Sequence, residues 1–231
     1  MGFLSLHGYG STILVGTVLT IEVSLLSLIV AMVLGVLGAL AKLSNSRVLR
    51  GAAQTYTTLI RGVPDLVLML LVFFGGQVFI NRMAQRLGYE EYIDINPFIA
   101  GVLTIGFIFG AYMTETFRGA ILAVPKGQIE AAQAYGMKKR QVFLRILAPQ
   151  MVRHAIPGFG NNWLVLIKTT ALVSIIGLDD MVRKAALAAG ATRKPFTFYL
   201  VVALLFLAIT TISVHVLKKL ETRYSVGVIK A

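Results

Sequence analysis

The sequence predicts an all-α integral membrane protein, a single domain of about five transmembrane helices. Of its 231 residues, 57% are apolar and only 14% are charged, whereas a soluble domain normally carries about a quarter charged residues. The mean hydropathy of +0.79 agrees with that class. Because a spanning helix needs roughly 20 apolar residues, about five such helices fit the chain once the loops are subtracted.

Polar segments separate the apolar ones and set the limits of each expected span. The predicted spans are residues 12–41, 52–80, 97–123, 156–178 and 196–217, and a polar loop covers residues 124–149. Small residues recur on the first span and would let helices approach closely. Pro64 removes a backbone donor from the second span, so we expect a kink there. No linker divides the chain, which predicts one transmembrane domain over residues 1–231.

The net charge of +12 has two readings. In a soluble protein it would indicate a nucleic-acid partner, but here the basic residues lie in short loops beside apolar spans. Most lysines and arginines follow the first and third spans or lie in the C-terminal tail. The positive-inside rule therefore predicts an N-terminus outside and a C-terminus in the cytoplasm. Lys42 is the first basic residue, so we expect no cleaved signal peptide.

Other compositional features argue against several kinds of chemistry. The chain has no cysteine, which excludes disulfides and thiol chemistry. Its three histidines are scattered without the spacing of metal ligands, so we expect no metal site. A phosphate-binding GxxxxGK[ST] loop does not occur in the sequence, so we expect this chain to bind no ATP itself.

The polar loop after the third span reads VPKGQIEAAQAYGMKKRQVFLRILAP. We expect Gly127 to form the turn into a short helix with Glu130 in its first turn, where a negative charge suits the helix dipole. Ala131 and Ala132 favour the helix, and Gly136 permits a left-handed turn into a second short helix. From spacing alone, an ordinary amphipathic cytoplasmic loop remains the alternative.

The same loop resembles the coupling loop of bacterial ABC-importer permeases. That pattern is Glu-Ala-Ala, three residues, Gly, nine residues, Ile, then Leu-Pro. Glu130, Gly136, Ile146 and Pro149 fit it, while Ala148 stands where the family usually has Leu. The segments RGVP, PKGQ and KTTALVS also look like polar-amino-acid permeases. More narrowly, TLIRGVPDLVLMLL, TETFRGA, GNNW and RYSVGV resemble first permease subunits of histidine/lysine/arginine/ornithine importers.

The resemblance implies the type I ABC-importer permease (MetI-like) fold with a cytoplasmic coupling helix. It implies a multi-pass protein of the bacterial inner membrane, in contact with lipid, with a periplasmic N-terminus and a cytoplasmic C-terminus. The chain would not be an enzyme and would bind no cofactor, since ATP and Mg belong to a partner ATPase dimer. A periplasmic substrate-binding protein and a second, similar permease subunit complete the assembly; a heterodimer is favoured and a homodimer stays open.

Charged side chains within membrane spans are costly and are candidates for functional sites. Asp65 and Glu115 could bind the extra cation of a basic amino acid. Each also has an arginine about one helical turn away, Arg61 and Arg118 respectively, so structural pairing is the alternative. We hypothesise that these arginines neutralise the acids until a cationic substrate displaces them. Lys168 either meets the substrate carboxylate or serves in pairing or gating.

The sequence thus predicts the permease subunit of an ATP-driven importer for basic amino acids: histidine, arginine, lysine and ornithine. Asp65 is its main sign of a cationic substrate, because relatives for neutral or acidic amino acids usually have an apolar residue there. A related polar-amino-acid importer with another substrate is the alternative. An ion-coupled carrier would show inverted repeats and paired broken helices, and a membrane enzyme a catalytic motif; the sequence shows neither.

Overall fold

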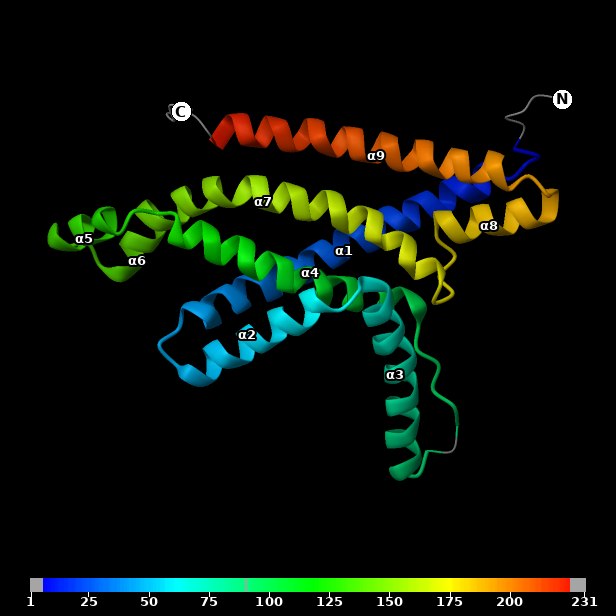
Figure 1. Ribbon diagram of the computed structural model, residues 1–231, viewed down its shortest axis with the longest axis horizontal. Coiled ribbons are helices and arrows are strands. Elements are labelled where there is room, and N and C mark those ends of the chain that lie inside the picture. Colours follow the sequence, from blue (N-terminus) through cyan, green and yellow to red (C-terminus); the bar gives the residue numbers. More distant parts are fainter. Residues whose placement is uncertain (1–5, 90, 225–231) are drawn as a thin grey trace.

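The computed structural model describes residues 6–89 and 91–224, and the described chain is helical with no strand (Figure 1). Its helices are α1 (Gly10–Leu43), α2 (Arg47–Gly62), α3 (Asp65–Arg86), α4 (Pro97–Leu122), α5 (Lys126–Ala134), α6 (Lys139–Val142), α7 (Ala148–Thr169), α8 (Met181–Thr192) and α9 (Pro195–Tyr224). Within these residues, α1, α3, α4 and α9 are long and apolar enough to cross a membrane.

Helices α1, α4, α7 and α9 run roughly along one axis, with α5 and α6 at one end and α8 at the other (Figure 1). The main core lies between α1 and α4, where Ile105, Ile108 and Met113 are fully buried. A smaller core joins α8 to α9 and to the start of α1, around Met181 and Phe198. Helix α4 therefore lies at the centre: it packs against α1 and α7, and α7 packs against α9.

Helices α1 and α4 touch through small residues, as the sequence predicted. A Cβ atom on Gly38 would lie 2.2 Å from Thr114 Oγ1, and one on Gly35 would lie 2.4 Å from Met113 Cβ. Both distances are far shorter than any van der Waals contact allows. The two backbones can approach this closely only because those positions of α1 carry no side chain.

The second expected span, residues 52–80 with a kink at Pro64, is two separate helices, α2 and α3. Val63 is extended, with φ −112° and ψ 138°, and Pro64 has ψ 136°. A proline disfavours the helical conformation of the residue before it and cannot donate its own backbone bond. The helix therefore stops at Gly62 instead of kinking, and Asp65 becomes the first residue of α3.

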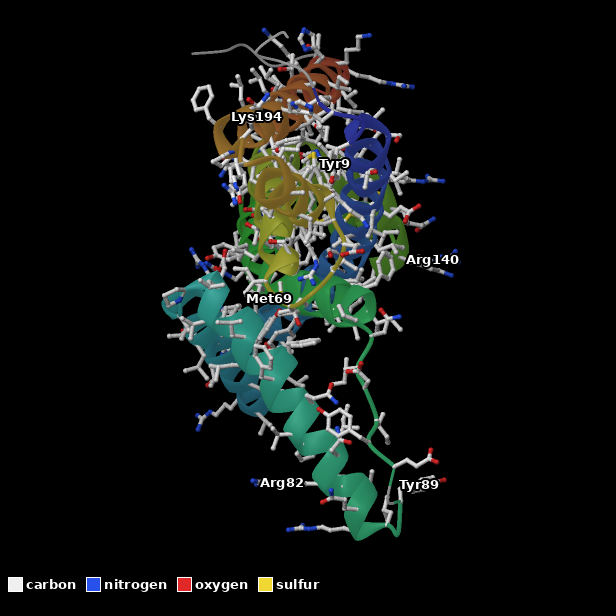
Figure 2. The ribbon with its side chains drawn as sticks, turned by 90° about the vertical axis from the view of Figure 1, so that its right-hand side faces the viewer. Tyr9, Met69, Arg82, Tyr89, Arg140 and Lys194 are labelled. Atoms are coloured by element: carbon white, nitrogen blue, oxygen red, sulfur yellow. The ribbon has the colours of Figure 1, made fainter. Side chains whose placement is uncertain are left out.

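Helix α3 leaves the bundle at a steep angle. Figure 2 places Met69, which is fully buried, where α3 meets the bundle, and Arg82 and Tyr89 at the far end. An extended segment returns along the helix and is held by two amide side chains. Asn81 Oδ1 accepts from the backbone N–H of Ile93 at 2.8 Å, and Gln77 Oε1 accepts from Ile95 at 2.9 Å.

The fourth expected span, residues 156–178, also has different limits. Helix α7 begins earlier, at Ala148, and ends at Thr169, after which Thr170–Ser174 forms a 3₁₀ turn. Among the described helices it is not one of the four apolar enough to span by composition, since its first half carries Gln150, Arg153 and His154. Helix α9, in contrast, contains the fifth expected span and continues to Tyr224.

We expect Gly38→Leu to destabilise the protein, because the new side chain must occupy the space of Thr114 on α4. Overpacking of this kind costs about 1–3 kcal/mol. Gly51→Leu on α2 is the matched control, since a Cβ atom there meets no neighbour within 4 Å. Thermal unfolding of the purified protein in detergent measures both changes, and equal midpoints for the two variants would contradict the close α1–α4 packing.

Candidate functional site

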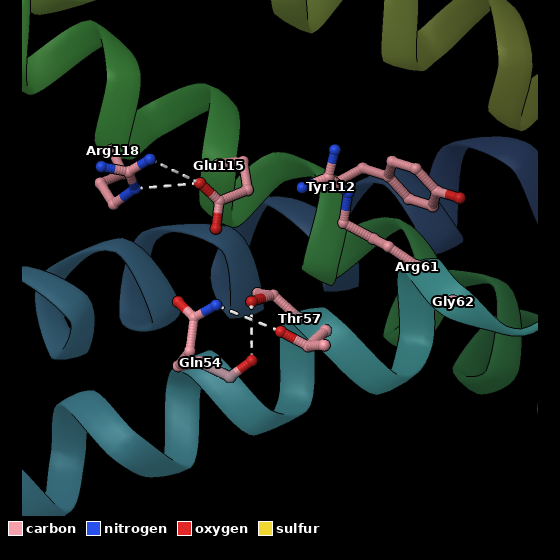
Figure 3. Close-up of a pocket in the computed structure, with 8 residues that line it drawn as sticks. Gln54, Thr57, Arg61, Gly62, Tyr112, Glu115 and Arg118 are labelled. Atoms are coloured by element: carbon pink, nitrogen blue, oxygen red, sulfur yellow. Dashed lines mark hydrogen bonds and ion pairs between the residues drawn. The ribbon is translucent and has the colours of Figure 1, made fainter.

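A polar cavity of about 480 Å³ lies between α2 and α4 (Figure 3). Five of its lining residues come from α2 and three from α4: Gln54, Thr57, Thr58, Arg61, Gly62, Tyr112, Glu115 and Arg118. Small-molecule sites commonly enclose about 300–1,000 Å³, so the volume suits a ligand the size of an amino acid.

Glu115 lines this cavity with both of its carboxylate oxygens paired. Arg118 donates to Oε2 from Nε at 2.9 Å and forms an ion pair through Nη2 at 2.9 Å. Lys42, in the last turn of α1, donates to Oε1 and also to Gln54 Oε1 at 2.8 Å. The structural pairing of Glu115 with Arg118 is therefore present, and Lys42 adds a second cation.

The sequence prediction had missed Lys42, which it counted only as a basic loop residue. Its side chain is 5% exposed, although it lies at the end of a helix. One signal was available: Lys42 and Glu115 both lie toward the expected cytoplasmic ends of the first and third spans, which run in the same direction. Charges at equal depth on adjacent helices have the opportunity to pair.

Asp65 is not paired with Arg61 in the same way. The ion pairs of the described residues all involve Glu115 or Asp179. Arg61 instead places its guanidinium carbon 5.6 Å from the centre of the Tyr112 ring, within the range of a cation–π contact. Asp65 is partly buried and is not one of the residues that line the cavity. The two predicted carboxylates are thus not brought together in one cavity in this protomer.

Lys168 lies in the last turn of α7, and its side chain is exposed. It is also not a lining residue of the cavity between α2 and α4. A role toward the substrate carboxylate therefore remains a prediction for Lys168.

The loop after α4 has the predicted helix–Gly–helix shape, with one correction. Gly136 is left-handed, with φ +79°, and lies between α5 and α6. Pro125 rather than Gly127 makes the turn into α5, since its carbonyl accepts from Gln128 N–H at 3.1 Å. Gly127 is thus helical and Glu130 falls in the second turn, not the first.

The two alanines of the motif face opposite ways. Ala132 is buried, with 7% of its surface exposed, whereas Ala131 and Glu130 are exposed. Tyr135, in the same turn, is 90% exposed. The loop therefore presents a protruding surface at the end of the molecule opposite α8 (Figure 1).

A buried carboxylate caps α8 where that helix packs against α1, at that other end. Asp180 has no exposed surface and caps α8, with Oδ1 accepting from the Arg183 N–H at 2.9 Å. Its Oδ2 is buried and has no hydrogen-bond partner among the described residues. The next N–H, of Met181, donates to Thr20 Oγ1 of α1 at 3.3 Å. Burial raises the pKa of Asp180 to about 6.

Known proteins resemble this chain both in sequence and in structure. An all-α chain whose apolar helices flank a polar cavity and whose helical loop protrudes has the architecture of a membrane transport component. The chain belongs to the family of binding-protein-dependent transport system inner membrane components, which it matches over residues 12–226.

Among relatives, it is 53% identical to the histidine/lysine/arginine/ornithine transport system permease protein HisQ of Salmonella typhimurium, covering 98% of this chain and 99% of that protein. It is 44% identical to the octopine transport system permease protein OccQ of Rhizobium radiobacter, covering 96% and 94%.

A crystal structure of an amino acid ABC transporter with histidines matches with a TM-score of 0.82 at 30% identity, covering 96% of this chain and 99% of that one. The inward-facing MetNI methionine ABC transporter matches with a TM-score of 0.62 at 15% identity, covering 94% and 95%. The second match shows the fold alone. Together they confirm the predicted MetI-like fold class.

The buried Asp180 predicts a dependence of stability on pH. Its pKa is raised from 3.8 to about 6 in the folded protein, so the native state binds the proton more tightly than the unfolded state does. The stabilisation is complete below pH 3.8 and is lost as the pH rises through about 6. We expect the thermal midpoint to fall between pH 5 and pH 7.5 in the wild type.

Asp180→Asn keeps a side-chain oxygen that can cap α8 but removes the group that titrates. The thermal midpoint of this variant should therefore change less between pH 5 and pH 7.5. Asp179→Asn is the matched control. Asp179 is exposed, and its hydrogen bond from Lys184 holds its pKa below the usual value, so this variant should keep the wild-type decline. Equal slopes for Asp180→Asn and wild type would contradict the assignment.

Proposed function

We propose that the chain is the transmembrane permease subunit of an ATP-driven ABC importer for basic amino acids: histidine, lysine, arginine and ornithine. The supporting observation is the 53% identity, over nearly the full length of both chains, to a permease named for those four substrates. The cavity between α2 and α4 adds a ligand-sized space bordered by a carboxylate. The 44% identity to an octopine permease favours the second candidate, an importer for a related substrate.

The chain order connects the protruding loop to the cavity. Helix α5 directly follows α4, which carries three cavity residues, and α6 leads through the π-helical turn Phe143–Leu147 into α7. A force on the loop is therefore applied to α4 and α7 together. In the proposed mechanism an ATPase dimer, which holds ATP and Mg, grips the surface around Gly127, Glu130, Ala131, Ala132 and Gly136 and moves these two helices.

The remaining partners follow from that assembly. One loop contacts one ATPase subunit, so a second, similar permease is required, in a heterodimer or a homodimer. The α5–α6 end lies in the cytoplasm of a bacterial cell and the α8 end faces the periplasm, where a binding protein delivers the substrate. This orientation is supported by the excess of basic residues near the loop and in the C-terminal tail. The ATPase activity belongs to the partner, and this chain is not an enzyme.

Within the permease we assign the cation of the substrate to Asp65 and Glu115. Asp65 begins α3, four residues after Arg61 in the last turn of α2. Glu115 lies in the cavity itself, but both of its oxygens are paired, so it must release one of its two cations to bind a ligand. Lys168 is proposed for the substrate carboxylate when the assembled transporter changes conformation.

Asp65→Asn tests the substrate assignment. Loss of one ion pair in a partly desolvated site should reduce the apparent affinity for labelled arginine by about tenfold, equivalent to 1.4 kcal/mol. The measurement is ATP-dependent uptake by vesicles that contain the whole transporter with its binding protein. Asp94→Asn, in the exposed segment beside α3, is the matched control and should transport as the wild type does.

Two outcomes of this experiment have different meanings. Unchanged arginine uptake by Asp65→Asn would remove Asp65 from the site and leave the importer intact. A wild-type transporter that hydrolyses ATP but takes up none of the four basic amino acids would contradict the proposed substrate class.

Gly136→Val tests the coupling role. A left-handed conformation costs a residue with a side chain about 1–2 kcal/mol, and a β-branched residue tolerates it worst, so α6 should be misdirected. We expect the chain to enter the membrane but to lose most ATPase copurification and transport. Gly190→Ala is the control, because Gly190 lies in α8, away from the loop, with open space around it. Full transport by Gly136→Val would contradict the proposed contact.

A further inference from the structure

The two cations on Glu115 differ in how freely they can leave it. Lys42 is 5% exposed, whereas Arg118 is 37% exposed. Arg118 lines the cavity and Lys42 does not. Arg118, which lines the cavity, donates to Oε2 of Glu115 (Figure 3), whereas Lys42, which does not line it, donates to Oε1.

The same two contacts also differ in what they connect. Arg118 lies three residues after Glu115 on α4, so breaking that pair separates no helices. Lys42 belongs to α1 and also donates to Gln54 of α2 at 2.8 Å, so its ammonium joins three helices. If Lys42 withdrew, it would leave an oxygen of the partly buried Glu115 carboxylate without its cation, which costs stability. Arg118 can turn into the open cavity and be solvated there.

We propose that Lys42 is the fixed counterion of Glu115 and that Arg118 is the exchangeable one, so that a cationic substrate side chain binds by replacing Arg118 on Oε2. This inference rests on the proposed import of basic amino acids. The guanidinium of arginine or the ammonium of lysine donates to a carboxylate as Arg118 does, so the number of charge-assisted bonds is conserved. A neutral side chain of a substrate cannot replace Arg118 in this way. Lys42 acts as a positioning residue, because it holds the Glu115 carboxylate that distinguishes cationic from neutral substrates.

The exchange predicts opposite effects for the two cations. Arg118→Gln removes the competitor, so the KM for L-arginine uptake should fall by about two- to fivefold, the factor that partly exposed ion pairs usually supply. The KM for L-citrulline, an uncharged analogue of equal length, should stay unchanged. Arg50→Gln is the matched control: it removes an exposed positive charge from α2 without touching Glu115 and should alter neither value.

Lys42→Gln should instead lower the thermal midpoint of the transporter without lowering the KM for arginine. Because this variant could fail to assemble, the double variant Lys42→Gln with Glu115→Gln provides a second measurement. Because neither charge of the Lys42–Glu115 pair remains, it should recover most of the lost thermal midpoint. Its uptake should no longer distinguish arginine from citrulline.

Three results would overturn the inference. The first is a fall in the arginine KM for Lys42→Gln as large as the fall for Arg118→Gln. The second is a rise in the arginine KM for Arg118→Gln. The third is a double variant whose thermal midpoint is no higher than that of Lys42→Gln alone. Each of them leaves the proposed function standing if wild-type uptake of arginine is normal. Absence of any basic-amino-acid uptake by the wild type would instead end the proposed function and this inference with it.

Discussion

The contact between the backbones of α1 and α4 is the constraint on which the rest of the molecule depends. Gly35 and Gly38 leave no space for any side chain between the helices, so their relative position has little freedom. Helix α4 carries the cavity residues and continues into α5, and α1 carries Lys42 at its end. The distance from Lys42 to Glu115 is consequently fixed by the packing along the whole α1–α4 pair. A movement of α5 must therefore displace α1 and α4 together.

The break at Pro64 explains why Arg61 and Asp65 are not a pair although four residues separate them. Arg61 lies in the last turn of α2 and Asp65 in the first turn of α3. A cation is stabilised at the C-terminal end of a helix and an anion at the N-terminal end. Each charge is thus supported by its own helix end, and Tyr112 adds a ring beneath Arg61. Neither side chain needs the other, so both stay available to a ligand.

The sequence predicted those features of the fold and the site that depend on local residue patterns. Apolar runs give the fold class and the approximate limits of α1, α4 and α9, and the turn at Gly136 follows from a motif. Lys42, Asp180 and the end of α2 were not predictable to the same degree. The contacts of Lys42 and Asp180 depend on the register between helices that are distant in sequence. Pro64 by itself is compatible with a kink in a helix as well as with a break between two helices.

The charges around the cavity also indicate what kind of ligand it suits. Its lining contains two arginines and one glutamate, and Lys42 stands behind the glutamate, so the wall is electropositive overall. A simple cation would gain little there. An amino acid with a cationic side chain brings both signs: its side chain takes Glu115 Oε2 from Arg118, and Arg61, which also lines the cavity, can receive the α-carboxylate. The cavity can therefore meet both charges of such a ligand, and a ligand with only one of the two charges would leave either Glu115 or Arg61 unused.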